Sequence, residues 1–166
     1  AIVLAPGYTK NPEETLRVIS KFTKLKIIIY NNPKFQKGQD LTEKFLREAA
    51  NNPNVLGIKD TSGKPEYFKK VLNIFHSKDK KVMQGDTKAG REVSIREADG
   101  MVPVEANLFP EHFSDLLNRE MEFNNEELVK DMSIISNKKF EINGDSTAAI
   151  KRILYEQGIF DSDLSY

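Results

Sequence analysis

A lysine at the end of a short apolar run is the residue best suited to chemistry in this sequence. The run Val55-Leu56-Gly57-Ile58 is followed by Lys59 and then by the polar turn Asp60-Thr61-Ser62-Gly63. Alternation along a strand predicts that Val55, Gly57 and Lys59 share one side, and that the residues between them face covering helices. At the carboxyl end of a parallel strand, a partly desolvated amine can attack a carbonyl carbon. The alternative is a lysine that reaches into solvent.

A second candidate lies one β-α unit earlier, in Tyr30-Asn31-Asn32-Pro33. By alternation Ile28 and Tyr30 share a face, and Tyr30 comes at the end of its strand. Neighbouring parallel strands are ~4.8 Å apart, so a phenol and an amine at equal heights could meet over one small molecule. Lysine would form an imine with a ketone, and tyrosine would transfer the protons. For Tyr30 alone, the alternative is an amphipathic aromatic at a strand end.

The chain reads as five β-α repeats followed by further helices. The expected strands are residues 2–5, 26–30, 55–59, 81–84 and 100–104, and the expected helices are residues 11–25, 42–49, 65–75, 87–98, 107–121, 126–136 and 146–157. Helix starts are indicated by the candidate caps Asn11, Thr42 and Asp145, by proline at the first position and by acids in the first turn. Short apolar strands that alternate with helices predict a parallel α/β sheet. Two architectures remain: a doubly wound five-stranded sheet, or part of a (β/α)8 barrel.

Composition excludes several classes of function. Of 166 residues, 25 are Lys or Arg and 25 are Asp or Glu, so the chain has no basic field with which to hold nucleic acid. No apolar run approaches the ~20 residues that span a bilayer, so no membrane partner is expected. The chain has no cysteine, which excludes thiolate catalysis and suits a cytoplasmic location. His76 and His112 have no second ligand at metal-binding spacing, so no metal site is predicted.

The first residues and Pro103 each affect how the predicted strands are interpreted. Residues 1–5 already resemble a buried strand, from which we expect the chain to begin partway through a fold. Pro103 lies inside the fifth expected strand, where a residue without an N–H group is unusual unless the strand is at an edge.

Four motifs carry a family resemblance. They are Tyr30-Asn31-Asn32-Pro33, Gly57-Ile58-Lys59-Asp60-Thr61, Gln84-Gly85-Asp86 and the stretch from Gly100 to Asn107. In order and spacing they resemble the pyruvate-dependent class I aldolase family, which includes dihydrodipicolinate synthase, N-acetylneuraminate lyase and 2-keto-3-deoxygluconate aldolase. The resemblance implies a (β/α)8 TIM barrel, with residues 1–120 as strands 4 to 8 and residues 121–166 as C-terminal helices. Five strands cannot close such a barrel alone. A homotetramer or homodimer of the full-length chain is also implied.

The resemblance implies roles for individual residues. The implied catalytic residues are Lys59 as the Schiff-base lysine, Tyr30 as the proton relay and Tyr8 as a relay partner across a subunit interface. The implied substrate-binding residues are Thr61, Gly85, Asp86 and Val102, the last through its backbone carbonyl. No cofactor is implied other than the covalent imine on Lys59, and no metal. The expected partner is a small-molecule 2-keto acid.

Two features favour the sugar-acid members of the family. Synthases usually carry an arginine shortly after the Tyr-Asn-x-Pro motif, where this sequence reads Lys34-Phe35-Gln36-Lys37. Thr61, two residues after Lys59, resembles the hydroxyl residue of the sugar-acid aldolases. We therefore predict a lyase that cleaves 2-keto-3-deoxy sugar acids to pyruvate and an aldehyde. Alternatives are synthase or N-acetylneuraminate lyase activity, and a catalytically silent fragment or assembly module without the carboxylate-binding loop.

Overall fold

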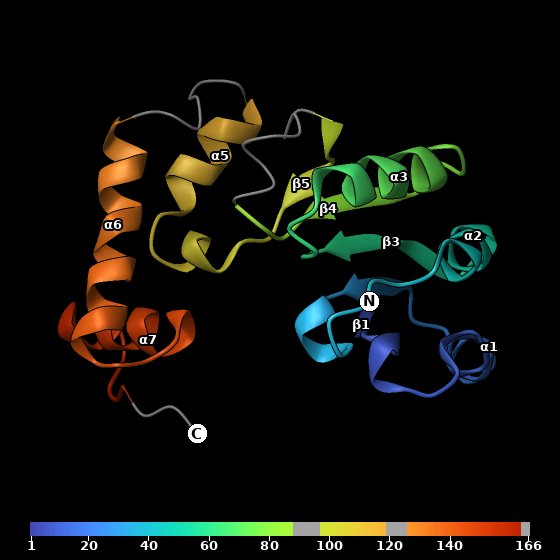
Figure 1. Cartoon of the computed structure of the whole chain (residues 1–166), viewed down its shortest axis with the longest axis horizontal. Coiled ribbons are helices and arrows are strands. Elements are labelled where there is room, and N and C mark those ends of the chain that lie inside the picture. Colours follow the sequence, from blue (N-terminus) through green and yellow to red (C-terminus); the bar gives the residue numbers. More distant parts are fainter. Residues whose placement is uncertain (88–96, 119–125, 164–166) are drawn as a thin grey trace. The chain divides into compact units, whose positions relative to one another are not determined.

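The computed structural model describes residues 1–87, 97–118 and 126–163, without the side chains of Tyr8 and Phe35. The chain forms two compact units, Ala1–Val102 and Pro103–Tyr166. Figure 1 shows the elements of both in sequence colours. The boundary predicted between residues 120 and 121 lies outside the described residues, as does nearly all of the helix predicted over residues 87–98.

The first unit is built on a parallel sheet whose spatial order, β1-β2-β3-β4-β5, is also the order along the chain. The strands are β1 (Ile2–Leu4), β2 (Ile27–Asn31), β3 (Val55–Asp60), β4 (Lys81–Gln84) and β5 (Gly100–Met101). Every neighbouring pair is parallel. Each new strand is added beside the previous one, as successive β-α units require. The predicted parallel α/β architecture is confirmed.

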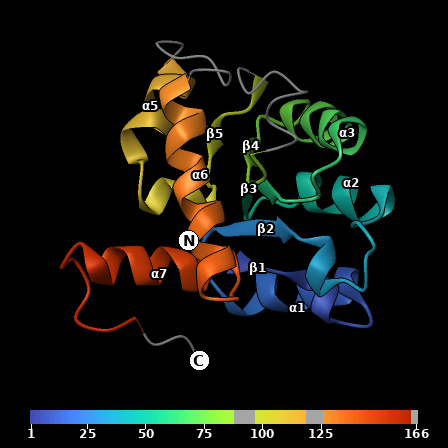
Figure 2. The ribbon, with the colours of Figure 1, turned by 60° about the vertical axis from the view of Figure 1, so that its left-hand side comes forward.

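Helices connect the strands and cover one face of the sheet. They are α1 (Pro12–Phe22), α2 (Glu43–Asn51) and α3 (Pro65–His76), with the short 3₁₀ turns η1 (Pro6–Tyr8) and η2 (Pro33–Phe35). The predicted caps form: Asn11 accepts a hydrogen bond from the Glu14 N–H, and Thr42 accepts one from the Phe45 N–H. Figures 1 and 2 show α1, α2 and α3 side by side along the same face of the sheet.

A continuous apolar core fills the space between the sheet and these helices. Its completely buried members include Leu16, Ile27, Ile29, Val55, Ile58, Val71, Phe75 and Val82. The opposite face of the sheet is open by comparison, because Val3 is 67% exposed and Leu56 is 43% exposed. On that face Ile28, Leu56 and Met83 line a cavity of ≈ 370 Å³. The two faces of one sheet therefore have different environments.

The register of β3 corrects one prediction. Val55 is buried in the helix-covered core and Leu56 is on the open face, the reverse of the predicted orientation. The reason is an irregularity in the ladder, since Ile27 pairs with Val55 but Ile28 pairs with Gly57. One additional residue in β3 shifts the alternation before it. After Gly57 the alternation follows the prediction.

The fifth strand is shorter than predicted. β5 ends at Met101, and Pro103 becomes the N-cap of η4 (Val104–Asn107). The Val102 N–H still donates to the Gln84 carbonyl at 2.8 Å. Pro103 cannot continue the ladder because it has no N–H to donate. The prediction of a strand over residues 100–104 is therefore wrong in its second half.

The second unit is helical in its described part. It contains η4, α5 (Pro110–Asn118), α6 (Glu126–Glu141) and α7 (Ser146–Glu156). Asp145 caps α7 as predicted, and Gly158 follows it with a φ of 72°. Helices α6 and α7 contact each other (Figure 2). The small core between them consists of Ile135, Ala149, Ile150, Ile153 and Leu154. Over the described ranges of both units, no helix is long and apolar enough to cross a membrane.

Candidate active site

The register of β2 and β3 brings the two predicted catalytic side chains together. Tyr30 pairs with Lys59 in the ladder, and both stand at the carboxyl ends of their strands. The Lys59 Nζ lies 4.9 Å from the centroid of the Tyr30 ring. This is the distance of a cation–π contact, so the amine and the phenol share one small region of the open face. A carbonyl compound bound there would lie within reach of both groups.

The Tyr30 hydroxyl has a hydrogen-bond partner that the sequence analysis missed. The Asn32 Nδ2 donates to the Tyr30 Oη at 2.8 Å, and the Asn32 Oδ1 accepts from the Lys34 N–H at 3.1 Å. Because the phenol oxygen accepts this bond, its own hydrogen is left for another acceptor. The second asparagine of Tyr-Asn-Asn-Pro was the only sequence signal for this contact.

Gly85 packs against both Lys59 and Thr61. A Cβ placed on Gly85 would lie 2.5 Å from the Thr61 Oγ1 and 2.7 Å from the Lys59 Cε. Position 85 therefore has no room for a side chain, and glycine allows the backbone to approach. The Thr61 Oγ1 is buried and has no hydrogen-bond partner within the described residues. A buried hydroxyl in this state is available to a bound molecule.

The other predicted site residues have different surroundings. The Asp86 N–H donates to the Gln84 Oε1 at 2.9 Å, and the Val102 N–H donates to the Gln84 carbonyl. The backbone of Tyr8 ends η1, and its side chain lies outside the described part of the chain. The structure thus brings Thr61 and Gly85 to Lys59, and it connects Asp86 and Val102 to Gln84.

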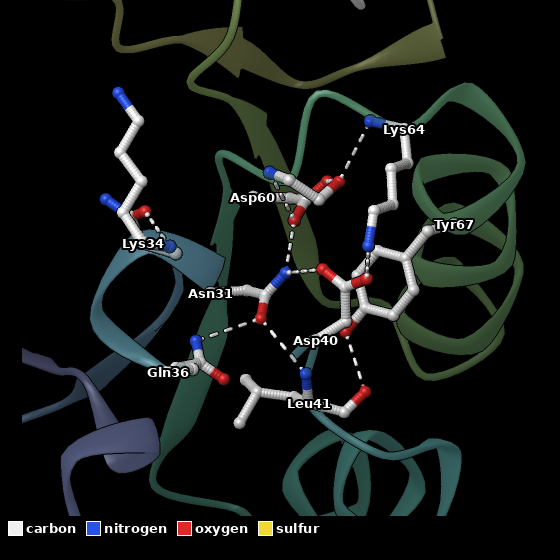
Figure 3. Close-up of polar contacts among 10 residues, drawn as sticks. Asn31, Lys34, Gln36, Asp40, Leu41, Asp60, Lys64 and Tyr67 are labelled. Carbon is white, nitrogen blue, oxygen red and sulfur yellow. Dashed lines mark hydrogen bonds and ion pairs between the residues drawn. The ribbon is translucent and has the colours of Figure 1, made fainter. Parts of the chain in front are cut away.

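A polar cluster lies on the helix-covered side of the same strands, and Figure 3 shows its contacts. It contains Asn31 and Asp60, the residues that follow Tyr30 and Lys59 and are 0% and 1% exposed. Burial raises the pKa of Asp60 from 3.8 to about 6, although hydrogen bonds from Asn31 and Ser62 act in the opposite direction. The sequence analysis quoted both residues within motifs but gave neither a role.

The two histidines each pair with one carboxylate. The His76 Nε2 lies 2.9 Å from the Asp99 Oδ2, and the His112 Nε2 lies 2.8 Å from the Asp131 Oδ2. Across residues 1–87, 97–118 and 126–163, no group of three or more His, Asp or Glu side chains could hold a metal ion. Each pair joins separate segments of the chain.

Two proteins that are similar in sequence to this chain are both 4-hydroxy-tetrahydrodipicolinate synthases. The 4-hydroxy-tetrahydrodipicolinate synthase of Methanococcoides burtonii is 30% identical over 122 residues, which cover 71% of this chain and 42% of the relative. The same enzyme of Porphyromonas gingivalis is 28% identical over 162 residues, which cover 94% of this chain and 54% of the relative. The chain thus spans about half the length of the curated relatives it matches.

Solved structures resemble the chain in fold. A dihydrodipicolinate synthase from Acinetobacter baumannii, complexed with pyruvate, matches with a TM-score of 0.71 and 25% identity, over 93% of this chain and 53% of that one. A Sulfolobus solfataricus 2-keto-3-deoxygluconate aldolase variant, also in complex with pyruvate, matches with a TM-score of 0.66 and 19% identity, over 93% and 50%. The five-stranded sheet therefore corresponds to part of a (β/α)8 barrel, which excludes the doubly wound alternative.

A sequence model of one family covers nearly all of the chain. The model describes the "Dihydrodipicolinate synthetase family" and matches residues 1–163. The match includes both strands that carry the lysine and tyrosine, and it agrees with the fold of the solved structures. The chain belongs to the dihydrodipicolinate synthetase family.

Proposed function

We propose that this chain carries the Schiff-base site of a pyruvate-dependent class I aldolase. The observation that carries the proposal is the Lys59 amine 4.9 Å from the Tyr30 ring, at the carboxyl ends of two paired strands. An amine and a phenol in this arrangement are the two groups that imine chemistry on a ketone requires. Membership of the family supports the same class of reaction. The substrate would be held covalently as an imine on Lys59, with no separate cofactor and no metal.

The reaction follows from these two side chains. The Lys59 nitrogen attacks the C2 carbonyl of a 2-keto acid, and the carbonyl oxygen leaves as water when the imine forms. The protonated imine accepts an electron pair, so the bond between C3 and C4 can break. Tyr30 removes the proton of the C4 hydroxyl during cleavage and returns it during synthesis. The products are an aldehyde and an enamine on Lys59. The enamine gains a proton at C3, and water then releases pyruvate and the free lysine amine.

As the substrate we propose a 2-keto-3-deoxy sugar acid, which is cleaved to pyruvate and an aldehyde such as glyceraldehyde. The Thr61 hydroxyl supports this choice, because it is buried next to Lys59 and can hydrogen-bond a substrate hydroxyl. The segment Lys34-Phe35-Gln36-Lys37 also offers no arginine for the carboxylate of a synthase substrate. Synthase activity is the second candidate, since the relatives described above are named as synthases.

Further features of the whole protein are proposed with this activity. Tyr8, Asp86 and Val102 retain the site roles implied by the family, and residues 121–166 remain a proposed helical extension after the barrel. A homotetramer or homodimer of the full-length chain in the cytoplasm is the expected state. A catalytically silent polypeptide is the alternative from a different class of function.

The test is to trap the imine. The polypeptide that carries these 166 residues is treated with pyruvate and borohydride, and the peptide that contains Lys59 is analysed by mass spectrometry. A reduced pyruvyl adduct on Lys59 is expected. If a folded sample forms no adduct, the Schiff-base function is wrong and the silent alternative holds.

The aldehyde is then tested separately. Release of pyruvate from 2-keto-3-deoxygluconate is compared with consumption of pyruvate in the presence of aspartate semialdehyde. Cleavage of the sugar acid at the higher kcat/KM is expected. A higher kcat/KM with aspartate semialdehyde would overturn the sugar-acid proposal and favour the synthase.

A further inference from the structure

Asn31 and Asp60 repeat the pairing of the catalytic residues on the opposite face of the sheet. In the ladder Tyr30 pairs with Lys59, and the next residues, Asn31 and Asp60, also pair. The first pair faces the open side and the second is buried beneath the helices. The Asn31 Nδ2 donates to the Asp60 Oδ1 at 2.7 Å, a short bond to a charged acceptor. This bond joins the ends of β2 and β3 directly behind the lysine and the tyrosine.

Asn31 uses its whole hydrogen-bonding capacity in this position. Its Oδ1 accepts from the Leu41 N–H and from the Gln36 Nε2, each at 3.1 Å. Its Nδ2 donates to the Asp40 Oδ1 at 3.2 Å as well as to Asp60 (Figure 3). A backbone N–H can only donate, so the amide oxygen of Asn31 must face Leu41 and the NH₂ group must face the two carboxylates. Asparagine, unlike aspartate, fits both sets of partners.

Hydrogen bonds and an ion pair also connect the cluster to the turn after Lys59 and to α3. Asp60 accepts from the Ser62 N–H at 3.2 Å and from the Ser62 Oγ at 2.8 Å, which fixes the turn after Lys59. Asp40 forms an ion pair of 2.6 Å with Lys64 at the start of α3. The Tyr67 hydroxyl of α3 donates to the Leu41 carbonyl at 2.9 Å.

We propose that Asn31 and Asp60 are positioning residues, which set the separation of the Lys59 amine and the Tyr30 phenol through their cross-strand hydrogen bond. The inference rests on the proposed Schiff-base function. Neither side chain reaches the open face, so both act through the backbone of the residues before them. Proton transfer is sensitive to misplacement, and an error of 1 Å can slow a reaction by about 100-fold. Formation of the imine needs only the lysine and is less demanding.

The charge of Asp60 controls this support. As a carboxylate, Asp60 accepts from Asn31 and twice from Ser62. A protonated Asp60 must donate from one oxygen, and of these partners only the Ser62 hydroxyl can accept, so the bond with Ser62 Oγ must reverse its direction. The surrounding groups are the Asp40 carboxylate, the Lys64 ammonium paired with it, the neutral Tyr67 hydroxyl and Lys59 on the other face. Burial of Asp60 moves its pKa to about 6, so the change falls near neutral pH.

The experiment separates proton transfer from imine formation. In deuterated water, NMR follows the exchange of the pyruvate methyl hydrogens, which requires both the imine and a correctly placed base. Borohydride trapping measures the imine alone. For Asp60→Asn we expect a wild-type yield of trapped adduct, an unchanged KM for pyruvate and an exchange kcat about 10-fold lower. The inflection near pH 6 in the wild-type exchange profile should disappear.

The matched control is Asp99→Asn at the other end of the strands. Asp99 also joins two elements, because it accepts from the Val82 N–H at 2.9 Å and pairs with Lys81 at 2.7 Å. It lies before β5 at the amino ends of the strands, so we expect the exchange rate and its inflection near pH 6 to remain. Loss of the inflection in Asp99→Asn would show that Asp60 is not its source and would overturn the proposal.

A milder variant covers the case in which Asp60→Asn does not fold. Ser62→Ala removes one hydrogen bond that favours the charged form of Asp60, so the inflection should move to higher pH without disappearing. An unmoved inflection in Ser62→Ala, or a wild-type rate and profile in folded Asp60→Asn, would overturn the positioning role. Failure of the wild-type protein to form any adduct would instead overturn the proposed function, so the two failures are distinguishable.

Discussion

The two faces of β2 and β3 are separated by one residue along each strand, yet they differ in how completely their polar atoms are satisfied. On the open face, Tyr30 accepts one bond from Asn32, and the Lys59 amine lies over its ring. On the covered face, the Asn31 amide makes four hydrogen bonds. This difference in hydrogen bonding fits the different roles proposed for the two faces. Within the described residues, the two side chains proposed to react retain unused hydrogen-bonding capacity, whereas the Asn31 amide, which is proposed to support them, has none left.

The largest effect should come from the lysine on the open face. Lys59→Ala is expected to remove the trapped pyruvyl adduct and to lower turnover by more than ~10³-fold, because no other group supplies the imine nitrogen. Lys81→Ala, at the start of β4, is the matched control and should form the adduct normally. Turnover near the wild-type level in Lys59→Ala would rule out the proposed Schiff-base mechanism.

Tyr30→Phe tests the second residue of the same face. Loss of a positioned proton-transfer group costs ~10²–10⁴-fold, so turnover should fall within that range. Borohydride trapping on Lys59 should be retained, because imine formation needs only the amine. If Tyr30→Phe also lost the adduct, the phenol would be needed to form the imine and the two roles would not be separable.

Asp60 on the covered face should make the free energy of unfolding depend on pH. A raised pKa means that folded Asp60 holds its proton more tightly than the unfolded chain does. Its contribution is therefore most favourable below pH ~4 and is lost as the pH rises through about 6, by roughly 3 kcal/mol. Urea unfolding at pH 4.5 and 7.5 should show wild type losing stability relative to Asp60→Asn over this range.

Asp99 provides the comparison of opposite sign. Burial opposes its ionisation, but hydrogen bonds from Lys81, the Val82 N–H and His76 outweigh burial and lower its pKa to about 2. Its contribution is present above pH ~4 and is lost as the pH falls through about 2. The stability of Asp99→Asn relative to wild type should therefore be nearly constant between pH 4.5 and 7.5. A constant difference for Asp60→Asn as well would contradict the shift in Asp60.

The smallest expected effect on turnover comes from a substitution at Gly85, which packs against Lys59. Gly85→Ala would place a Cβ 2.7 Å from the Lys59 Cε, so the lysine must move and turnover should fall by about 10-fold. Gly100→Ala is the matched control, since its nearest contact, the Met83 Cγ, is 3.8 Å away. Kinetics of both variants check this, and equal turnover in the two would show that the close packing at Gly85 is not needed.

Local sequence patterns predicted most of the fold and the juxtaposition of Tyr30 and Lys59. Helix caps at Asn11, Thr42 and Asp145 formed as expected, because a cap depends on residues only three positions apart. Strand alternation placed Tyr30 and Lys59 on one face, because a period of two is a property of the extended chain. Pro103 correctly counted against a full fifth strand, although the strand was still predicted too long.

The sequence by itself determined the alternation of strands and helices and the positions of Lys59 and Tyr30 at strand ends. The tertiary structure decided the extra residue at Leu56, the approach of Gly85 to Lys59 and the partners of Asn31. The physical reason is the range of the interactions. Periodicity and capping act within a few residues, whereas a ladder register and a buried hydrogen bond depend on segments that meet only when the sheet has formed.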